Sequence, residues 1–122
     1  MLEDMMSGAR IKSVPYQTDY RLFLTRLTAD EIASIKEALN VRIEGSEIET
    51  AGWMPGSNWE GTPYQAIYEK AARRDHKGAA RCFGLMVWEV FMARPERWTS
   101  GRFEKDGEPI GSRTYFRPRD GA

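Results

Sequence analysis

The residues whose types and spacing could do chemistry gather between positions 52 and 94. A loop rich in glycine and proline carries Trp53 and Trp59, and the longest apolar run follows at 82–88. Ligand pockets commonly have aromatic walls and a few placed polar groups. We weigh two interpretations equally: a pocket between the loop and the apolar run, or tryptophans that only close the end of a sheet. The candidate pocket residues are Trp53, Ser57, Asn58, Trp59, Glu60, Thr62, Tyr64, Tyr68, Trp88 and Glu89.

Two carboxylates in this set are candidates for acid–base chemistry. Glu89 interrupts the apolar run and Glu60 lies in the nearby loop. A partly buried carboxylate often has a raised pKa and then serves as a general acid or base. The favoured alternative is an ion pair from Glu89 to Arg81, to Arg94 or to a neighbouring strand. A small enzyme that uses Glu89 or Glu60 is therefore our second hypothesis.

Nucleophilic and metal chemistry find little support in the composition. The chain has one histidine, His76, and one cysteine, Cys82. Six residues apart on one helix, they differ by about 120° around its axis and about 9 Å along it, beyond hydrogen-bond reach. One histidine and one cysteine also cannot build a structural zinc site. We expect no catalytic dyad, no metal and no cofactor.

The glycine spacing of the loop suggests phosphate binding, and its details argue against it. Gly56 and Gly61 lie five residues apart ahead of a helix. A P-loop ends in Gly-Lys-Ser/Thr, whose lysine reaches the terminal phosphates. Here Thr62 and Pro63 follow Gly61, and Glu60 would repel phosphate. We reject the nucleotide motif and keep only a weak anion site at the helix start as an alternative.

Charge is balanced over the chain and unevenly distributed along it. Residues 1–61 carry 6 basic and 10 acidic side chains, and residues 62–122 carry 12 and 8. Basic and aromatic residues alternate at 102–104 and 113–119, a pattern that can grip nucleic acid. Acidic neighbours and zero net charge argue against it. A nucleic-acid binder acting through this hairpin is our third hypothesis, and packing of the two halves is favoured over it.

Length and composition indicate a single globular domain. The chain has 122 residues, 41% hydrophobic and 30% charged, enough to bury a core without staples. The longest apolar run is too short to cross a bilayer, and residues 1–9 lack the features of a signal peptide. A lone cysteine fits a reducing cytoplasm. We expect a flexible leader over 1–9, one domain over 10–117 and a frayed tail over 118–122.

The first half predicts two strands, a helix and a further strand. Residues 10–16 and 19–26 read as strands, the second with Tyr20, Leu22 and Leu24 at a period of two. A capping box at Thr28 predicts a helix to about residue 40. The segment 41–50 then reads as a strand.

The second half predicts two helices and a hairpin. A proline at the first helical position predicts a helix over 63–73 that buries Ile67. Asp75 caps a second helix over 76–94, which Pro95 ends. Strands at 98–104 and 110–117 enclose a turn at 106–107.

The helix over 76–94 is apolar on two sides. Ala79, Phe83, Met86 and Val90 share one face, and Leu85, Trp88 and Met92 lie on the other. Small domains rarely bury a helix on both sides. We therefore expect the Leu85, Trp88 and Met92 face to meet the tryptophan loop or, slightly less favoured, a second subunit.

Two segments carry a resemblance to a known group of proteins. The stretch 56–64 (GSNWEGTPY) and the stretch 83–88 (FGLMVW) resemble small uncharacterised proteins of bacterial mobile elements, of the integron gene-cassette type. The resemblance covers about half of the chain. It implies a soluble bacterial accessory protein, often oligomeric, with no catalytic residues to carry over.

Taken together, the patterns predict an α+β fold. We expect an antiparallel sheet of four or five strands, with about three helices packed on one face. The favoured function is a non-enzymatic protein, a homodimer in the cytoplasm, that binds a small molecule or another protein at the aromatic pocket. Nucleic acid is a disfavoured partner, and no membrane contact is expected.

Overall fold

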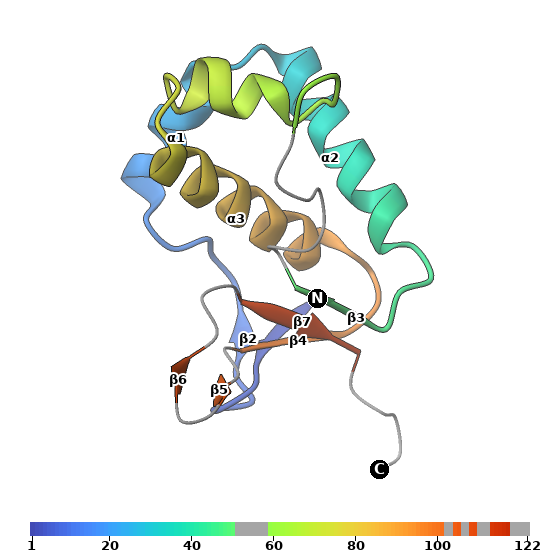
Figure 1. Ribbon diagram of the computed structural model, residues 1–122. Helices are drawn as coiled ribbons and strands as arrows, with labels where there is room; N and C mark the ends of the chain where they lie inside the picture. Colours follow the sequence, from blue (N-terminus) through green and yellow to red (C-terminus); the bar gives the residue numbers. More distant parts are fainter. Residues whose placement is uncertain (51–58, 102–103, 106–107, 110–112, 118–122) are drawn as a thin grey trace.

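The chain folds into a mixed five-stranded sheet with helices on one face (Figure 1). The computed structural model describes residues 1–50, 59–101, 104–105, 108–109 and 113–117. The α+β class is confirmed. The strand order is β2-β1-β4-β7-β3. The strands are β1 (Leu2–Asp4), β2 (Arg10–Ile11), β3 (Ile48–Thr50), β4 (Trp98–Gly101) and β7 (Thr114–Phe116).

The sheet is not purely antiparallel, which corrects the prediction. β1 runs parallel to β4 and pairs Leu2 with Trp98, while the other neighbours are antiparallel. A separate two-stranded ladder, β5 (Glu104–Lys105) and β6 (Glu108–Pro109), lies within the predicted hairpin. The pairing of β4 with β7 confirms that hairpin, and its predicted turn at 106–107 lies outside the described residues.

The N-terminal residues belong to the sheet, so the predicted flexible leader over 1–9 is wrong. Leu2 in β1 is fully buried, and the Met5 N–H donates to the Ser100 carbonyl at 2.9 Å. Three residues are too few to show a period of two, which is why the sequence pattern missed this strand. The strand expected over 10–16 is only the two-residue β2, which ends before Pro15.

The predicted strand over 19–26 is a helix, α1 (Gln17–Thr25). Tyr20 and Leu27 are buried, and Phe23 and Leu24 pack against the core. These four positions have the i, i+3, i+4, i+7 spacing of a helix face. Leu22, which supported the strand, is 51% exposed.

The predicted helix after Thr28 is confirmed as α2 (Ala29–Ile43). Thr28 accepts from the Glu31 N–H while the Glu31 carboxylate accepts from the Thr28 N–H, a complete capping box. Ile35, Leu39 and Ile43 are fully buried. This four-residue repeat carries the helix past residue 40, so the strand expected over 41–50 begins only at β3.

The predicted helix over 63–73 is shorter and wider than expected. The structure has a π-helix, η2 (Ile67–Ala71), after one helical turn. Ile67 is fully buried, as predicted. Arg73 and Arg74 then have positive φ, 50° and 65°, which end the helix.

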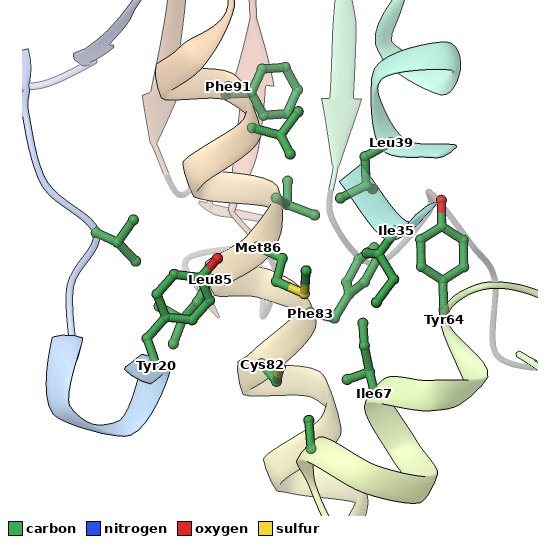
Figure 2. Close-up of a cluster of buried hydrophobic side chains, with 14 of the residues drawn as sticks. Tyr20, Ile35, Leu39, Tyr64, Ile67, Cys82, Phe83, Leu85, Met86 and Phe91 are labelled. Atoms are coloured by element: carbon green, nitrogen blue, oxygen red, sulfur yellow. The ribbon is translucent and has the colours of Figure 1, made fainter. Parts of the chain in front are cut away.

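The predicted C-terminal helix is confirmed as α3 (His76–Ala93), which Asp75 caps by accepting from the Gly78 N–H at 2.7 Å. It lies at the centre of the domain (Figure 1). Leu85 is 5% exposed and sits with Tyr20 of α1 in the buried cluster of Figure 2. α1 contacts α3, so the segment predicted as a strand contributes to the cover of α3 as a helix.

Candidate functional site

The predicted pocket residues do not form one pocket: Trp59 and Tyr64 lie on one side of α3, and Trp88 lies on another. Trp59 and Tyr64 both pack on Phe83 of α3, with ring centroids 5.4 Å apart in each case. Tyr64 and Phe83 are buried, and Trp59 is partly buried. This end of the loop therefore contributes to the core. Trp53, Ser57 and Asn58 lie outside the described residues.

Trp88 lies on another side of α3. Positions 83 and 88 differ by about 140° around a helix, so Trp88 points away from the Trp59 cluster. The guanidinium of Arg113, just before β7, lies 4.5 Å from the Trp88 ring centroid. Arg113 also donates to the Ser100 hydroxyl at 3.1 Å. The Trp88 indole N–H is buried and has no hydrogen-bond partner within the described part of the chain.

Glu89 forms an ion pair with Lys36 of α2. The ion pair is therefore confirmed with a different partner: of the two arginines expected, Arg81 pairs with Asp19, and Arg94 pairs with Glu44 and Glu96. Both side chains are about one-third exposed, 32% and 33%. Burial, and next the nearby Glu89 carboxylate, raise the pKa of Tyr20. The phenol therefore stays protonated beside this pair.

Among the other predicted residues, Tyr68 and Thr62 are partly buried, and Tyr68 packs against the core. Tyr68 contacts His76, with ring centroids 5.1 Å apart. Glu60 is exposed. The Thr62 hydroxyl donates to the Trp59 carbonyl at 2.6 Å, which ties the end of the loop to the start of the helical turn.

Thr62 also lines an open groove between the first turns of α2 and residues 62–70. Its volume is about 510 Å³. Lys70 crosses the groove and forms an ion pair with Glu31 at 2.7 Å. The hydrogen bond from Lys70 is the largest cause that lowers the pKa of Glu31, and the hydrogen bond from the Thr28 backbone is the next. The groove is lined by Asp30, Glu31, Ser34, Thr62, Pro63, Gln65, Ala66, Glu69 and Lys70.

Sequence reasoning found only Thr62 of this groove. Its two walls are about 30 residues apart in the chain, and no local period links them. The capping box located Glu31, but as a helix start rather than as a groove wall.

Cys82 is not activated as a nucleophile, and the described residues contain no metal cluster. Burial raises the pKa of the Cys82 thiol to about 12, so the reactive thiolate is scarce at neutral pH. Among the residues that the structure describes, no group of three or more histidine, cysteine, aspartate or glutamate side chains could hold a metal ion.

Of the described arginines of the C-terminal hairpin, Arg113 is partly exposed and Arg117 is exposed. Arg113 lies against Trp88, and the Arg117 guanidinium lies 5.9 Å from the Trp98 ring centroid. Both therefore pack on tryptophans of the domain. Arg102 and Arg119 lie outside the described residues.

Comparison with known proteins adds no relative. No family model, no curated protein and no solved structure matches the chain. The resemblance to integron gene-cassette proteins therefore stays a prediction. None of the helices in the described ranges has the length and apolar character that a membrane span requires.

Proposed function

We propose that the chain is a non-enzymatic binding protein that holds a positively charged ligand or protein segment in the groove between α2 and residues 62–70. The groove itself is the observation that carries this proposal. Three of its lining residues, Asp30, Glu31 and Glu69, are acidic, and one, Lys70, is basic. Lys70 pairs with Glu31, and Arg74, outside the lining, pairs with Glu69. The excess negative charge of the lining therefore comes from Asp30, and it favours a cationic ligand.

The binding role is favoured over catalysis by the state of the candidate reactive groups. Cys82 is buried with a raised pKa, and the Glu89 carboxylate is neutralised by Lys36. A general acid or base must combine a suitable pKa with access to substrate. Cys82 lacks that access, and the Glu89 carboxylate is engaged by Lys36. The homodimer remains a prediction, to be checked by native mass spectrometry.

The groove is tested with a tetralysine peptide as the probe. We expect saturable binding by isothermal titration calorimetry that weakens as salt is added, because the attraction is electrostatic. Ser34→Trp fills the groove and should weaken binding about tenfold or more, a loss of about 1.4 kcal/mol. Ala33→Trp is the matched control, since Ala33 is an exposed neighbour on α2 that does not line the groove.

Two results would refute the proposal. One is equal binding of the peptide to the Ser34→Trp and Ala33→Trp variants. The other is equal affinity of the native protein for tetralysine and tetraglutamate, which would show that the acidic lining does not discriminate between cationic and anionic peptides.

A further inference from the structure

Two side-chain pairs join α3 to the segment of β7: Phe91 with Tyr115, and Trp88 with Arg113. One helical turn beyond Trp88 along α3, Phe91 stacks on Tyr115 of β7 with centroids 4.2 Å apart and planes at 9°. Two residues before Tyr115, the Arg113 guanidinium lies over the Trp88 ring, 4.5 Å from its centroid. Phe91 and Tyr115 are buried, whereas Trp88 and Arg113 are partly exposed. Trp88 and Arg113 therefore place a cation at the partly exposed margin of the helix–sheet interface.

Within the described residues, this pair holds hydrogen-bond donors to which no carboxylate is paired. A guanidinium that stacks on a ring keeps its in-plane N–H groups free for a carboxylate. One nitrogen of the Arg113 guanidinium donates to the Ser100 hydroxyl. Neither an ion pair of Arg113 nor a hydrogen bond of the Trp88 indole occurs among the described residues. A buried donor without a partner costs about 1–3 kcal/mol.

Elsewhere in the protein, one carboxylate accepts hydrogen bonds from both an arginine and a tryptophan indole. The Glu96 carboxylate accepts from the Trp98 indole N–H at 3.0 Å and from the Arg94 guanidinium. One carboxylate thus bridges the two donor types. Trp88 and Arg113 present the same two donors, and the described chain brings no carboxylate to them. The carboxylate of Glu89, the next residue along α3, already forms an ion pair with Lys36.

We propose that Trp88 and Arg113 form a binding site for a carboxylate group of a small ligand, in which the ligand takes the part that Glu96 plays beside Arg94 and Trp98. The carboxylate lies on the free edge of the Arg113 guanidinium and accepts from the indole N–H. The indole nitrogen is shielded from solvent, so binding includes a small shift of the two partly exposed side chains. Met92, one turn beyond Trp88 and partly buried, offers an apolar contact for the rest of the ligand.

Benzoate is the probe, because it joins a carboxylate to an apolar body. The four indole N–H signals are followed by heteronuclear NMR, and Trp88→Phe identifies the Trp88 signal. For so small a ligand we expect a Kd on the order of 1 mM. The Trp88 signal should move saturably, as expected for a donor that gains an acceptor, while the Trp98 signal stays in place.

Arg113→Gln removes the charge and should raise the Kd about tenfold or more. Arg113→Lys keeps the charge without the planar fork and should also bind more weakly, which preserves the test if the first variant folds poorly. Arg117→Gln is the matched control, since Arg117 also lies over a tryptophan, Trp98, whose indole already has its carboxylate. This variant should bind benzoate as the native protein does.

Three outcomes would overturn the assignment. The Trp88 signal could remain unmoved at benzoate concentrations well above the expected Kd. Arg113→Gln could titrate like the native protein. Inorganic phosphate could bind as tightly as benzoate, which would show a site for any anion. The site is remote in sequence from the groove of α2, so either proposal can fail alone.

Discussion

Two consecutive arginines adopt a backbone conformation that L-residues avoid. Arg73 and Arg74 have φ of 50° and 65°. They follow the π-helix η2, where the Ala72 N–H donates to the Ile67 carbonyl at 2.8 Å and the Arg74 N–H to the Tyr68 carbonyl at 2.7 Å. These bonds hold the left-handed turn that leads the chain into the cap of α3. The strain is local and costs about 1–2 kcal/mol per residue.

Replacing Arg73 by glycine should therefore stabilise the protein. Arg73 is exposed, and glycine adopts positive φ without steric cost. After the entropic cost of glycine, we expect Arg73→Gly to raise the free energy of unfolding by about 0.5–1 kcal/mol. Chemical denaturation measures it. Arg21→Gly, at an exposed position inside α1, is the control and should lower stability by about 1 kcal/mol. A loss of stability in Arg73→Gly would show that the arginine itself is required there.

At the scale of elements, α2 is the helix whose start is best specified by its own residues. The Thr28 and Glu31 side chains satisfy each other's backbone N–H groups, at 3.1 and 2.9 Å. Free N–H groups at a helix start otherwise depend on water or other partners. Glu31 additionally pairs with Lys70, so the same turn connects α2 to the segment that carries η2.

Thr28→Ala should lower the free energy of unfolding by about 1 kcal/mol, because it removes the acceptor for the Glu31 N–H. Urea denaturation followed by circular dichroism measures the change. Ser34→Ala is the control, since Ser34 is exposed within α2, and alanine should be neutral or slightly stabilising there. Equal effects of the two substitutions would contradict a specific role for the cap.

At the scale of the whole molecule, one carboxylate joins several parts of the fold. Glu96 lies between α3 and β4 and accepts from Arg94 and from the Trp98 indole. Arg94, whose side chain is 9% exposed, also donates to Glu44 beyond the end of α2 at 2.7 Å. The hydrogen bond from Arg94 is the main cause that lowers the pKa of Glu96, to about 2. This cluster fastens the end of the helical layer to the sheet.

The depressed pKa of Glu96 predicts how stability depends on pH. A carboxylate with a lowered folded-state pKa stabilises the protein above its unfolded value of 4.5, and that contribution is lost as pH falls towards 2. Glu96→Gln should cost about 2 kcal/mol at neutral pH, and the difference from the native protein should shrink between about pH 4.5 and pH 2. Thermal unfolding across this pH range measures it.

The control for this prediction is Glu37→Gln, an exposed change on α2. It should alter stability little at either end of the pH range. If the Glu96→Gln and native curves stayed equally far apart from neutral to acidic pH, the carboxylate charge would not be the source of the stabilisation.

Local chemistry allowed several elements to be predicted from the sequence. The starts of α2 and α3 depend on capping side chains within three residues of the backbone groups that they satisfy, Thr28 and Asp75. The burial of Ile67, the α+β class and the pairing of β4 with β7 also follow from short-range patterns. For α1 the pattern was ambiguous: Tyr20 and Leu24 fit both a strand and a helix, and Phe23 and Leu27 decide for the helix.

The candidate sites depended on contacts between distant parts of the chain. Lys36 of α2 neutralises Glu89, and Arg113 lies over Trp88, across 53 and 25 positions. The groove joins α2 to residues 62–70, and β1 enters the sheet beside β4 at the other end of the chain. By itself the sequence determined where α2 and α3 begin and which class of fold results, because those depend on neighbouring residues. Only the tertiary structure decided which charges pair and which donors remain unmatched, because side chains far apart in sequence meet only when helices and sheet pack.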